Sequence, residues 1–325
     1  MASQLPTSPY PLAVPGPRTR SLRVLALAIA LLTSLALFTA TADAATKKKK
    51  QQHKPPVVTT KTPITRGSRY LALGDSVAFG YQEDGVAPTP NYHDASGLVG
   101  YPELIGRALH LKVANAACPG ETSSSLLDPD AQSNGCENSP GRPSSGYRTT
   151  FPLHVSYTGS QADFAVSYLA AHKDVRLVTL MIDANDFYVC QETTADGCGS
   201  LAEQAAMANR VTANVKSILS AVRKTAHYRG QLAIVNYYSL NYASPATNAQ
   251  TRMLNTLQDA AAKPFHVVIA NGFGEWQTDA ARFAGDTCAA GLLTQLGMPG
   301  RCGIYPSYAG QALLAQALEK VVRLP

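Results

Sequence analysis

The stretch Val175-Arg-Leu-Val-Thr-Leu-Met-Ile182, followed at once by Asp183-Ala-Asn-Asp186, predicts more about the fold than any other part of the chain. Six of its first eight residues are apolar. Such nearly unbroken apolar runs are typical of strands that are buried on both faces, as in parallel sheets. Parallel strands are joined by long crossover connections, usually helices. We therefore expect helices between this strand and its neighbours.

The rest of the chain shows that alternation. Further strands are predicted at 69–73, 111–116, 232–238 and 266–270. Helices are predicted at 101–110, 161–172, 201–222, 247–262 and 313–322, where apolar residues recur at steps of three and four. Five strands alternating with helices predict an open, doubly wound α/β sheet in one domain over residues 67–325.

The N-terminal 44 residues have the pattern of a secretory signal peptide. Arg18, Arg20 and Arg23 precede a mostly apolar run over 24–40, and Ala42-Asp43-Ala44 is a small-x-small cleavage signal. We expect the mature, exported protein to begin near Ala45. The alternative is an uncleaved membrane anchor, because 17 residues approach the minimum length of a membrane span.

Residues 45–66 are predicted to form a disordered basic linker, since they are polar and contain proline without apolar periodicity. Lys47 to Lys50 suggest a weak contact with an anionic envelope polymer or lipid headgroup, the alternative being a solvated linker. Residues 45–66 hold seven basic residues and no acidic one, so the net charge of +6 comes from the N-terminal 66 residues. The mildly acidic remainder disfavours a nucleic-acid partner.

The even number of cysteines indicates disulfides in an exported chain. Six cysteines allow 15 pairings, but they lie in three sequence-local pairs. Sequential pairing is the simplest choice: Cys118–Cys136, Cys190–Cys198 and Cys288–Cys302. The chain has no C-x-x-C spacing, which argues against structural zinc.

Ligands of open α/β sheets bind outside the carboxyl ends of the strands, so the residues that end each strand carry most of the chemical information. The first strand ends in Gly74-Asp75-Ser76, the second runs into Cys118-Pro119-Gly120, and the third ends in Asp183-Ala184-Asn185. A serine at such a turn presents its hydroxyl at the sheet edge, while a backbone N–H and an asparagine amide can donate to an oxyanion. Together these positions predict an acyl-transfer site.

With these motifs the chain resembles the GDSL, or SGNH, hydrolase family over residues 68–323. The resemblance implies a flavodoxin-like three-layer α/β/α fold and the activity of an esterase, lipase or carbohydrate deacetylase. It implies that Ser76 is the nucleophile and that Ser76 N–H, Gly120 and Asn185 form the oxyanion hole. The three cysteine pairs also look like those of secreted bacterial members.

The chain departs from the family pattern at two places. Asp183 stands where the third block has glycine, which adds bulk and negative charge beside the oxyanion site. The last block of the family reads Asp-x-x-His-Pro, whereas this chain has Cys302 at the acid position and Tyr305 at the histidine position. Because a tyrosine has a pKa near 10, it is a poor acceptor for the serine proton. His154, in a loop, is the better of two candidate substitute bases, the other being His93.

Two hypotheses follow. The first is a secreted serine ester hydrolase, active through a substitute base or at a reduced rate, acting on a small ester, lipid or acylated glycan. The second is an inactive relative that binds an acylated lipid or glycan in the same cleft. Both expect a monomer, and no nucleotide or metal cofactor is implied.

Overall fold

The computed structural model describes residues 62–298 and 300–325. These residues all belong to one unit of the chain. The predicted signal peptide and Lys47 to Lys50 lie outside the described residues. Residues 62–66, at the end of the predicted linker, pack on the domain: Ile64 is buried, and its N–H donates to the carbonyl of Arg323 over 3.0 Å.

Within the described residues, five parallel strands form the main sheet in the order β2-β1-β3-β4-β5. The strands are β1 (Arg69–Gly74), β2 (Lys112–Asn115), β3 (Val175–Met181), β4 (Gln231–Val235) and β5 (Val268–Ala270). The predicted doubly wound α/β sheet is confirmed, and each strand lies within two residues of its expected bounds except at the end of β4, which is three residues short of the expected residue 238. In this strand order the connections leave β1 in opposite directions, which opens a crevice at the carboxyl ends of β1 and β3.

Helices connect the strands as the apolar periodicity predicts. They are α1 (Ser76–Phe79), α2 (Tyr101–Ala108), α3 (Tyr147–Thr150), α4 (Gln161–Ala171), α5 (Ala184–Thr193), α6 (Leu201–Ser220), α7 (Pro245–Ala262), α8 (Gly272–Ala280) and α9 (Tyr308–Glu319). The structure adds elements that the sequence patterns did not predict: α1, α3, α5, α8 and an antiparallel hairpin of β6 (Leu293–Gln295) and β7 (Cys302–Pro306).

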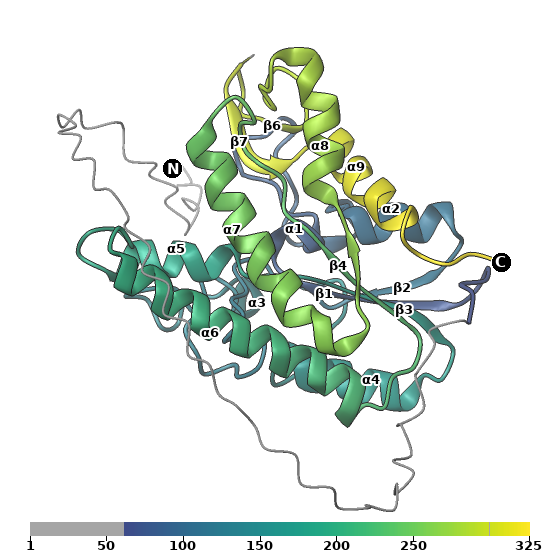
Figure 1. Ribbon diagram of the computed structural model, residues 1–325. Helices are drawn as coiled ribbons and strands as arrows, with labels where there is room; N and C mark the ends of the chain where they lie inside the picture. Colours follow the sequence, from purple (N-terminus) through teal and green to yellow (C-terminus); the bar gives the residue numbers. More distant parts are fainter. Residues whose placement is uncertain (1–61, 299) are drawn as a thin grey trace, which may run out of the picture. The chain divides into compact units, whose positions relative to one another are not determined.

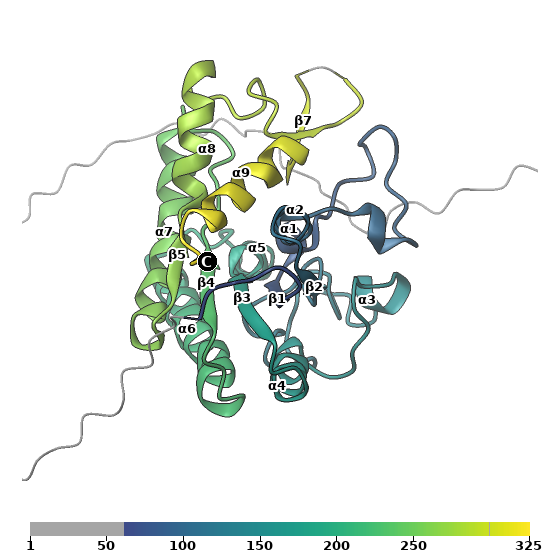
Figure 2. The ribbon, with the colours of Figure 1, turned by 90° about the vertical axis from the view of Figure 1, so that its right-hand side faces the viewer.

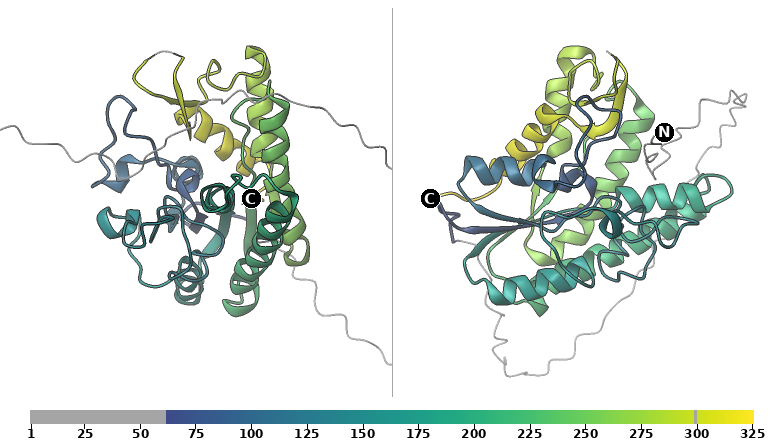
Figure 3. Two further views of the ribbon diagram at one scale, coloured as in Figure 1. Left: turned by 90° about the vertical axis from the view of Figure 1, so that its left-hand side faces the viewer. Right: turned by 180° about the vertical axis from the view of Figure 1, so that it is seen from behind.

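The helices cover both faces of the sheet. Figure 1 shows α4 and α6 below the strands and α2, α8 and α9 above them, and the view from behind in Figure 3 shows the same three layers. In Figure 2 the hairpin that contains β7 lies on the same side of the sheet as α8 and α9. β7 therefore brings the last block of the sequence to the layer above the carboxyl ends of the strands.

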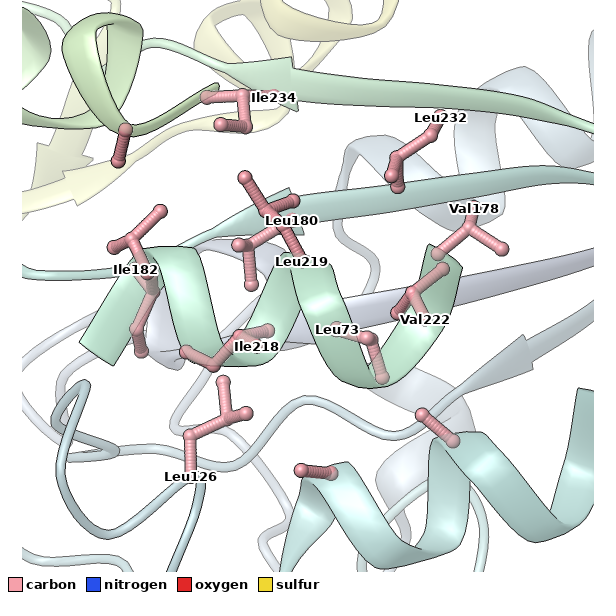
Figure 4. Packing of buried hydrophobic residues seen from close by; sticks show 14 of the residues in the cluster. Leu73, Leu126, Val178, Leu180, Ile182, Ile218, Leu219, Val222, Leu232 and Ile234 are labelled. Atoms are coloured by element: carbon pink, nitrogen blue, oxygen red, sulfur yellow. The ribbon is translucent and has the colours of Figure 1, made fainter. Parts of the chain in front are cut away.

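On the face of the sheet covered by α4 and α6, the hydrophobic core is formed by alternate residues of the strands and by the apolar face of α6. Figure 4 shows Val178, Leu180 and Ile182 of the third strand and its end directed at Ile218 and Leu219 of α6. All five side chains are at most 1% exposed. Burial of such a side chain stabilises the fold by about 1.5–3 kcal/mol, so this contact fixes β3 and the residues that follow it.

All six cysteines lie in the described residues, and they pair as predicted: Cys118–Cys136, Cys190–Cys198 and Cys288–Cys302. The paired cysteines are 18, 8 and 14 residues apart in sequence, so each bond closes one local loop. Among the described residues, no helix has the length and the apolar character that crossing a membrane requires.

Candidate active site

Ser76 lies at the turn from β1 into α1. Asp75 precedes the helix, and its Oδ1 accepts from the N–H of Val77 over 2.9 Å, which caps α1. Gly74 has φ +146°, and a Cβ there would overlap the carbonyl oxygen of Met181 on β3. Glycine therefore lets β1 end close against β3, with Ser76 directly above the crevice.

A pocket of about 100 Å³ opens over this turn. Ser76, Asn185 and Tyr305 all line it, as does Asp75. The remaining lining residues are mostly apolar or aromatic and come from α1, α5, α7 and the segments around β4 and β7: Val77, Ala184, Phe187, Tyr188, Tyr237, Tyr238, Leu240, Thr247, Gln250, Thr251, Leu254 and Ile304. The structure thus brings three of the four predicted catalytic residues to one pocket.

Asn185, in the first turn of α5, has a fixed side-chain orientation. Its Nδ2 donates to the carbonyl of Glu121 over 3.0 Å, and its Oδ1 accepts from Nδ2 of Asn134 over 2.9 Å. The carboxamide has a second N–H beyond the one that Glu121 accepts. Asn185 is therefore arranged as a hydrogen-bond donor at the edge of the pocket.

Gly120 is not among the residues that line the pocket. It is linked to Asn185 by Asn134, which is hydrogen-bonded to both residues. It has φ +83°, and a Cβ there would overlap the carbonyl of Asn134. The carbonyl of Gly120 accepts from the N–H of Asn134 over 2.7 Å. Glycine is therefore required here, because the backbones of Gly120 and Asn134 approach so closely. That Gly120 contributes to the oxyanion hole stays a prediction.

Tyr305 lines the same pocket as Ser76. Burial raises the pKa of Tyr305 well above its ordinary value, and the Ser76 side chain offsets this shift only in part. Its ring also packs edge-on against Tyr81, with centroids 4.9 Å apart. A phenol in this environment stays neutral, so it occupies the place of a general base without the ability to accept the serine proton.

Glu83, which no sequence motif indicated, holds the segment around Tyr305. The side chain is 5% exposed. Its Oε1 accepts from the N–H of Ile304 over 2.7 Å and from that of Tyr305 over 3.4 Å, and its Oε2 accepts from Thr294 Oγ1 over 2.6 Å. One buried carboxylate thus joins the loop after α1 to both strands of the hairpin. No pattern in the sequence indicates this pairing, because Glu83 is far from the hairpin along the chain.

Two buried carboxyl groups with hydrogen-bond partners lie near the start of α1 and α5. Burial raises the pKa of Asp75 to about 7, although Tyr237 Oη and Val77 N–H donate to its carboxylate. Burial likewise raises the pKa of Asp186 to about 6, although Ser123 donates to it through its N–H and its hydroxyl.

Asp183 has no such partners. Both of its carboxyl oxygens are buried without a hydrogen bond in the described part of the chain. Burial raises the pKa of Asp183 well above its ordinary value, with Gln258 of α7 offsetting the shift only in part. The neutral acid is thereby favoured, so the negative charge expected beside the oxyanion site is disfavoured. Its φ of +106° lies in the region that favours glycine, which explains why glycine suits this position.

Neither loop histidine reaches the pocket. His154 Nε2 is hydrogen-bonded to the carbonyl of Phe79 over 2.9 Å, and its ring packs on Phe79 with centroids 4.6 Å apart. His93 is exposed and packs against Phe151. Neither residue lines the pocket of Ser76. This geometry argues against His154 as a substitute base.

Potential metal ligands gather at one place within residues 62–298 and 300–325. Cys118, Glu121 and Cys136 have ligand atoms within 4.8 Å of one another, but the two sulfurs form a disulfide. Metal binding by cysteine requires a thiolate, so this cluster does not fit a metal. Cys302 is likewise disulfide-bonded to Cys288, and it offers no carboxylate beside position 305.

The fold and the pocket together define an α/β protein with a serine presented at the carboxyl end of its first strand. The chain belongs to the GDSL-like Lipase/Acylhydrolase family, whose model matches residues 72–313. The predicted membership is confirmed. No curated protein matches the chain.

Several solved structures share the fold at low sequence identity. Phospholipase A1 from Streptomyces albidoflavus NA297 is 18% identical with a TM-score of 0.49, covering 78% of this chain and 99% of that one. The acetylxylan esterase Axe2 from Geobacillus stearothermophilus is 13% identical with a TM-score of 0.48, covering 80% and 95%. A GDSL-like lipase from Parabacteroides merdae, described as putative, is 12% identical with a TM-score of 0.47, covering 79% and 96%.

Proposed function

We propose that the chain is an exported serine ester hydrolase whose turnover is limited by the absence of a general base. The observation that carries this proposal is the shared pocket of Ser76 and Asn185. In the reaction, Ser76 Oγ bonds to the ester carbonyl carbon and the alcohol leaves. Water then releases the acyl group from the serine.

The donors around Ser76 support this chemistry. As the carbonyl is attacked, negative charge develops on its oxygen, and a fixed N–H of Asn185 stabilises that charge more than it stabilises the neutral ester. The N–H of Ser76 and that of Gly120 are proposed as the further donors. The Asp75 carboxyl is already engaged by Val77 and Tyr237.

The limiting step is removal of the serine proton. Tyr305 lies in the pocket of Ser76, but its phenol remains neutral. Loss of the base of a serine hydrolase lowers turnover by up to about 10⁶-fold. The rest of the site still accelerates the reaction by about 10³–10⁴-fold over the uncatalysed rate. We therefore expect slow hydrolysis.

The substrate is proposed to be an ester with a short acyl chain. The pocket measures about 100 Å³, and Phe187, Leu254 and Ile304 give it an apolar wall. Such a space suits an acyl chain of a few carbons. Rates on p-nitrophenyl acetate, butyrate and octanoate test this: acetate and butyrate should exceed octanoate, and Ser76→Ala should abolish all three.

A second candidate function is binding without turnover, favoured by the buried, neutral phenol of Tyr305 in the pocket of Ser76, at the place of the general base. On this proposal the protein holds an acylated lipid or glycan in the same pocket. Calorimetric titration with acetylated xylooligosaccharides distinguishes the two, since a binder gives saturable heat with no release of acetate.

A further inference from the structure

Asn134 connects the two residues assigned to the oxyanion hole. Its side chain donates to Oδ1 of Asn185 over 2.9 Å, and its backbone N–H donates to the carbonyl of Gly120 over 2.7 Å. It lies in the loop that the Cys118–Cys136 disulfide closes. A residue outside the pocket thus contacts both the asparagine and the glycine.

The hydrogen bonds allow one orientation of the Asn185 carboxamide. The carbonyl of Glu121 can only accept, so Nδ2 of Asn185 has to face it. Oδ1 then faces Asn134, which supplies the matching donor. If the amide turned over, Oδ1 would face the Glu121 carbonyl, and the second N–H would be directed away from its present place.

We propose that Asn134 is a positioning residue that holds the Asn185 carboxamide with an N–H available to the acyl oxygen. The inference rests on the proposed function, in which Asn185 stabilises the oxyanion. Asn134 itself does not line the pocket, so it acts through Asn185.

The sharpest variant is Asn134→Asp, which keeps the shape of the side chain. Above its pKa the carboxylate can only accept, so it repels Oδ1 of Asn185 and favours the reversed amide. Below its pKa the protonated acid donates again and restores the original orientation. A role limited to filling space would not change with pH. Asn134→Ala, which removes donor and charge together, is the second variant.

Two measurements are needed. Gln132→Ala in the same loop is the matched control, because Gln132 is exposed and its side chain donates to Ser133 and Asn138 rather than to Asn185. The first follows the side-chain amide signals of Asn185 by NMR in ¹⁵N-asparagine-labelled protein from pH 8 to pH 4. The second compares kcat and KM on a Tyr305→His background. Melting temperatures check that each variant is folded.

We expect the Asn185 signals to move in Asn134→Asp at pH 8 and to return towards those of the parent at pH 4, while Asn134→Ala shifts them at every pH. We expect kcat of Asn134→Asp to fall at least tenfold at pH 8 with KM nearly unchanged, and the ratio to the parent to recover as pH falls. Removal of a whole oxyanion donor lowers kcat by about 10²–10³-fold. A fall in kcat up to that limit is what a misoriented Asn185 amide would give.

Unchanged amide signals would overturn the proposal, as would a shifted amide with undiminished kcat. If no version hydrolyses esters, the proposed function fails, while the amide signals still decide whether Asn134 orients Asn185.

Discussion

Tyr305 and Ser76 line the same pocket. Glu83 accepts from the backbone N–H of Tyr305, and the ring of Tyr81 packs against the Tyr305 ring. The aromatic residue is therefore a fixed part of the site rather than a loose replacement. Because burial keeps its phenol neutral, Tyr305 does not activate the nucleophile.

Exchange of this residue for histidine should raise activity. We expect Tyr305→His to hydrolyse p-nitrophenyl acetate at least tenfold faster than the natural protein, because an imidazole with a pKa near 6.5 accepts the proton that a phenol does not. Recovery should be incomplete, since Cys302 provides no carboxylate to orient the ring. Initial rates at pH 8 measure this.

Tyr308→His is the matched control for that exchange, since Tyr308 is 63% exposed at the start of α9. It should leave the rate as it is, and Ser76→Ala should remove the activity of every version. A natural protein that is already fast, and that slows on His154→Ala, would refute the assignment of Tyr305 as the defect.

Asp183→Gly should stabilise the fold by about 1–3 kcal/mol, because it removes a buried carboxyl without partners and a strained positive φ. Burial raises the pKa of Asp183 above 3.8, so folding takes up a proton there. The stability of the natural protein should therefore fall relative to the variant as pH rises above 3.8. Urea unfolding at several pH values measures the difference.

Ala284→Gly is the control for the backbone contribution, since Ala284 has φ +53° but is exposed and has no carboxyl. Ala284→Gly should raise the free energy of unfolding by less than Asp183→Gly does, and its effect should not depend on pH. An equal gain in both variants would mean that backbone strain alone, without the carboxyl, accounts for the effect.

Glu83→Ala should lower stability by roughly 2–4 kcal/mol, because it leaves the N–H groups of Ile304 and Tyr305 and the hydroxyl of Thr294 without their acceptor. Asp84→Ala changes the exposed neighbour and should have little effect. Thermal unfolding of the two variants compares them. Equal melting temperatures would show that the hairpin is held by other contacts.

Export makes a separate prediction. N-terminal sequencing of protein recovered from the medium should give a start near Ala45, and non-reducing peptide mapping should give the three sequential disulfides. Retention of the full chain in the membrane fraction would favour an uncleaved membrane anchor.

Mutating Cys288 and Cys302 together to serine should lower the free energy of unfolding by about 2–4 kcal/mol, since the disulfide closes a loop between residues 14 apart in sequence.

The sequence alone predicted the sheet, the main helices and the disulfide pairs, because period-two and period-3.6 patterns and local cysteine spacing depend on neighbours along the chain. It also predicted that Ser76 and Asn185 meet, since the carboxyl ends of parallel strands share one edge. The short helix α5 and the β6–β7 hairpin escaped these patterns, because their few apolar positions are set by packing against other elements. Only the tertiary structure decided that Tyr305 lies in the pocket of Ser76, that Glu83 holds the hairpin, that Asn134 donates to Asn185 and that His154 faces Phe79. Each of these contacts joins residues distant in sequence, and the direction in which a side chain points is fixed by the elements packed around it, for which no local pattern exists.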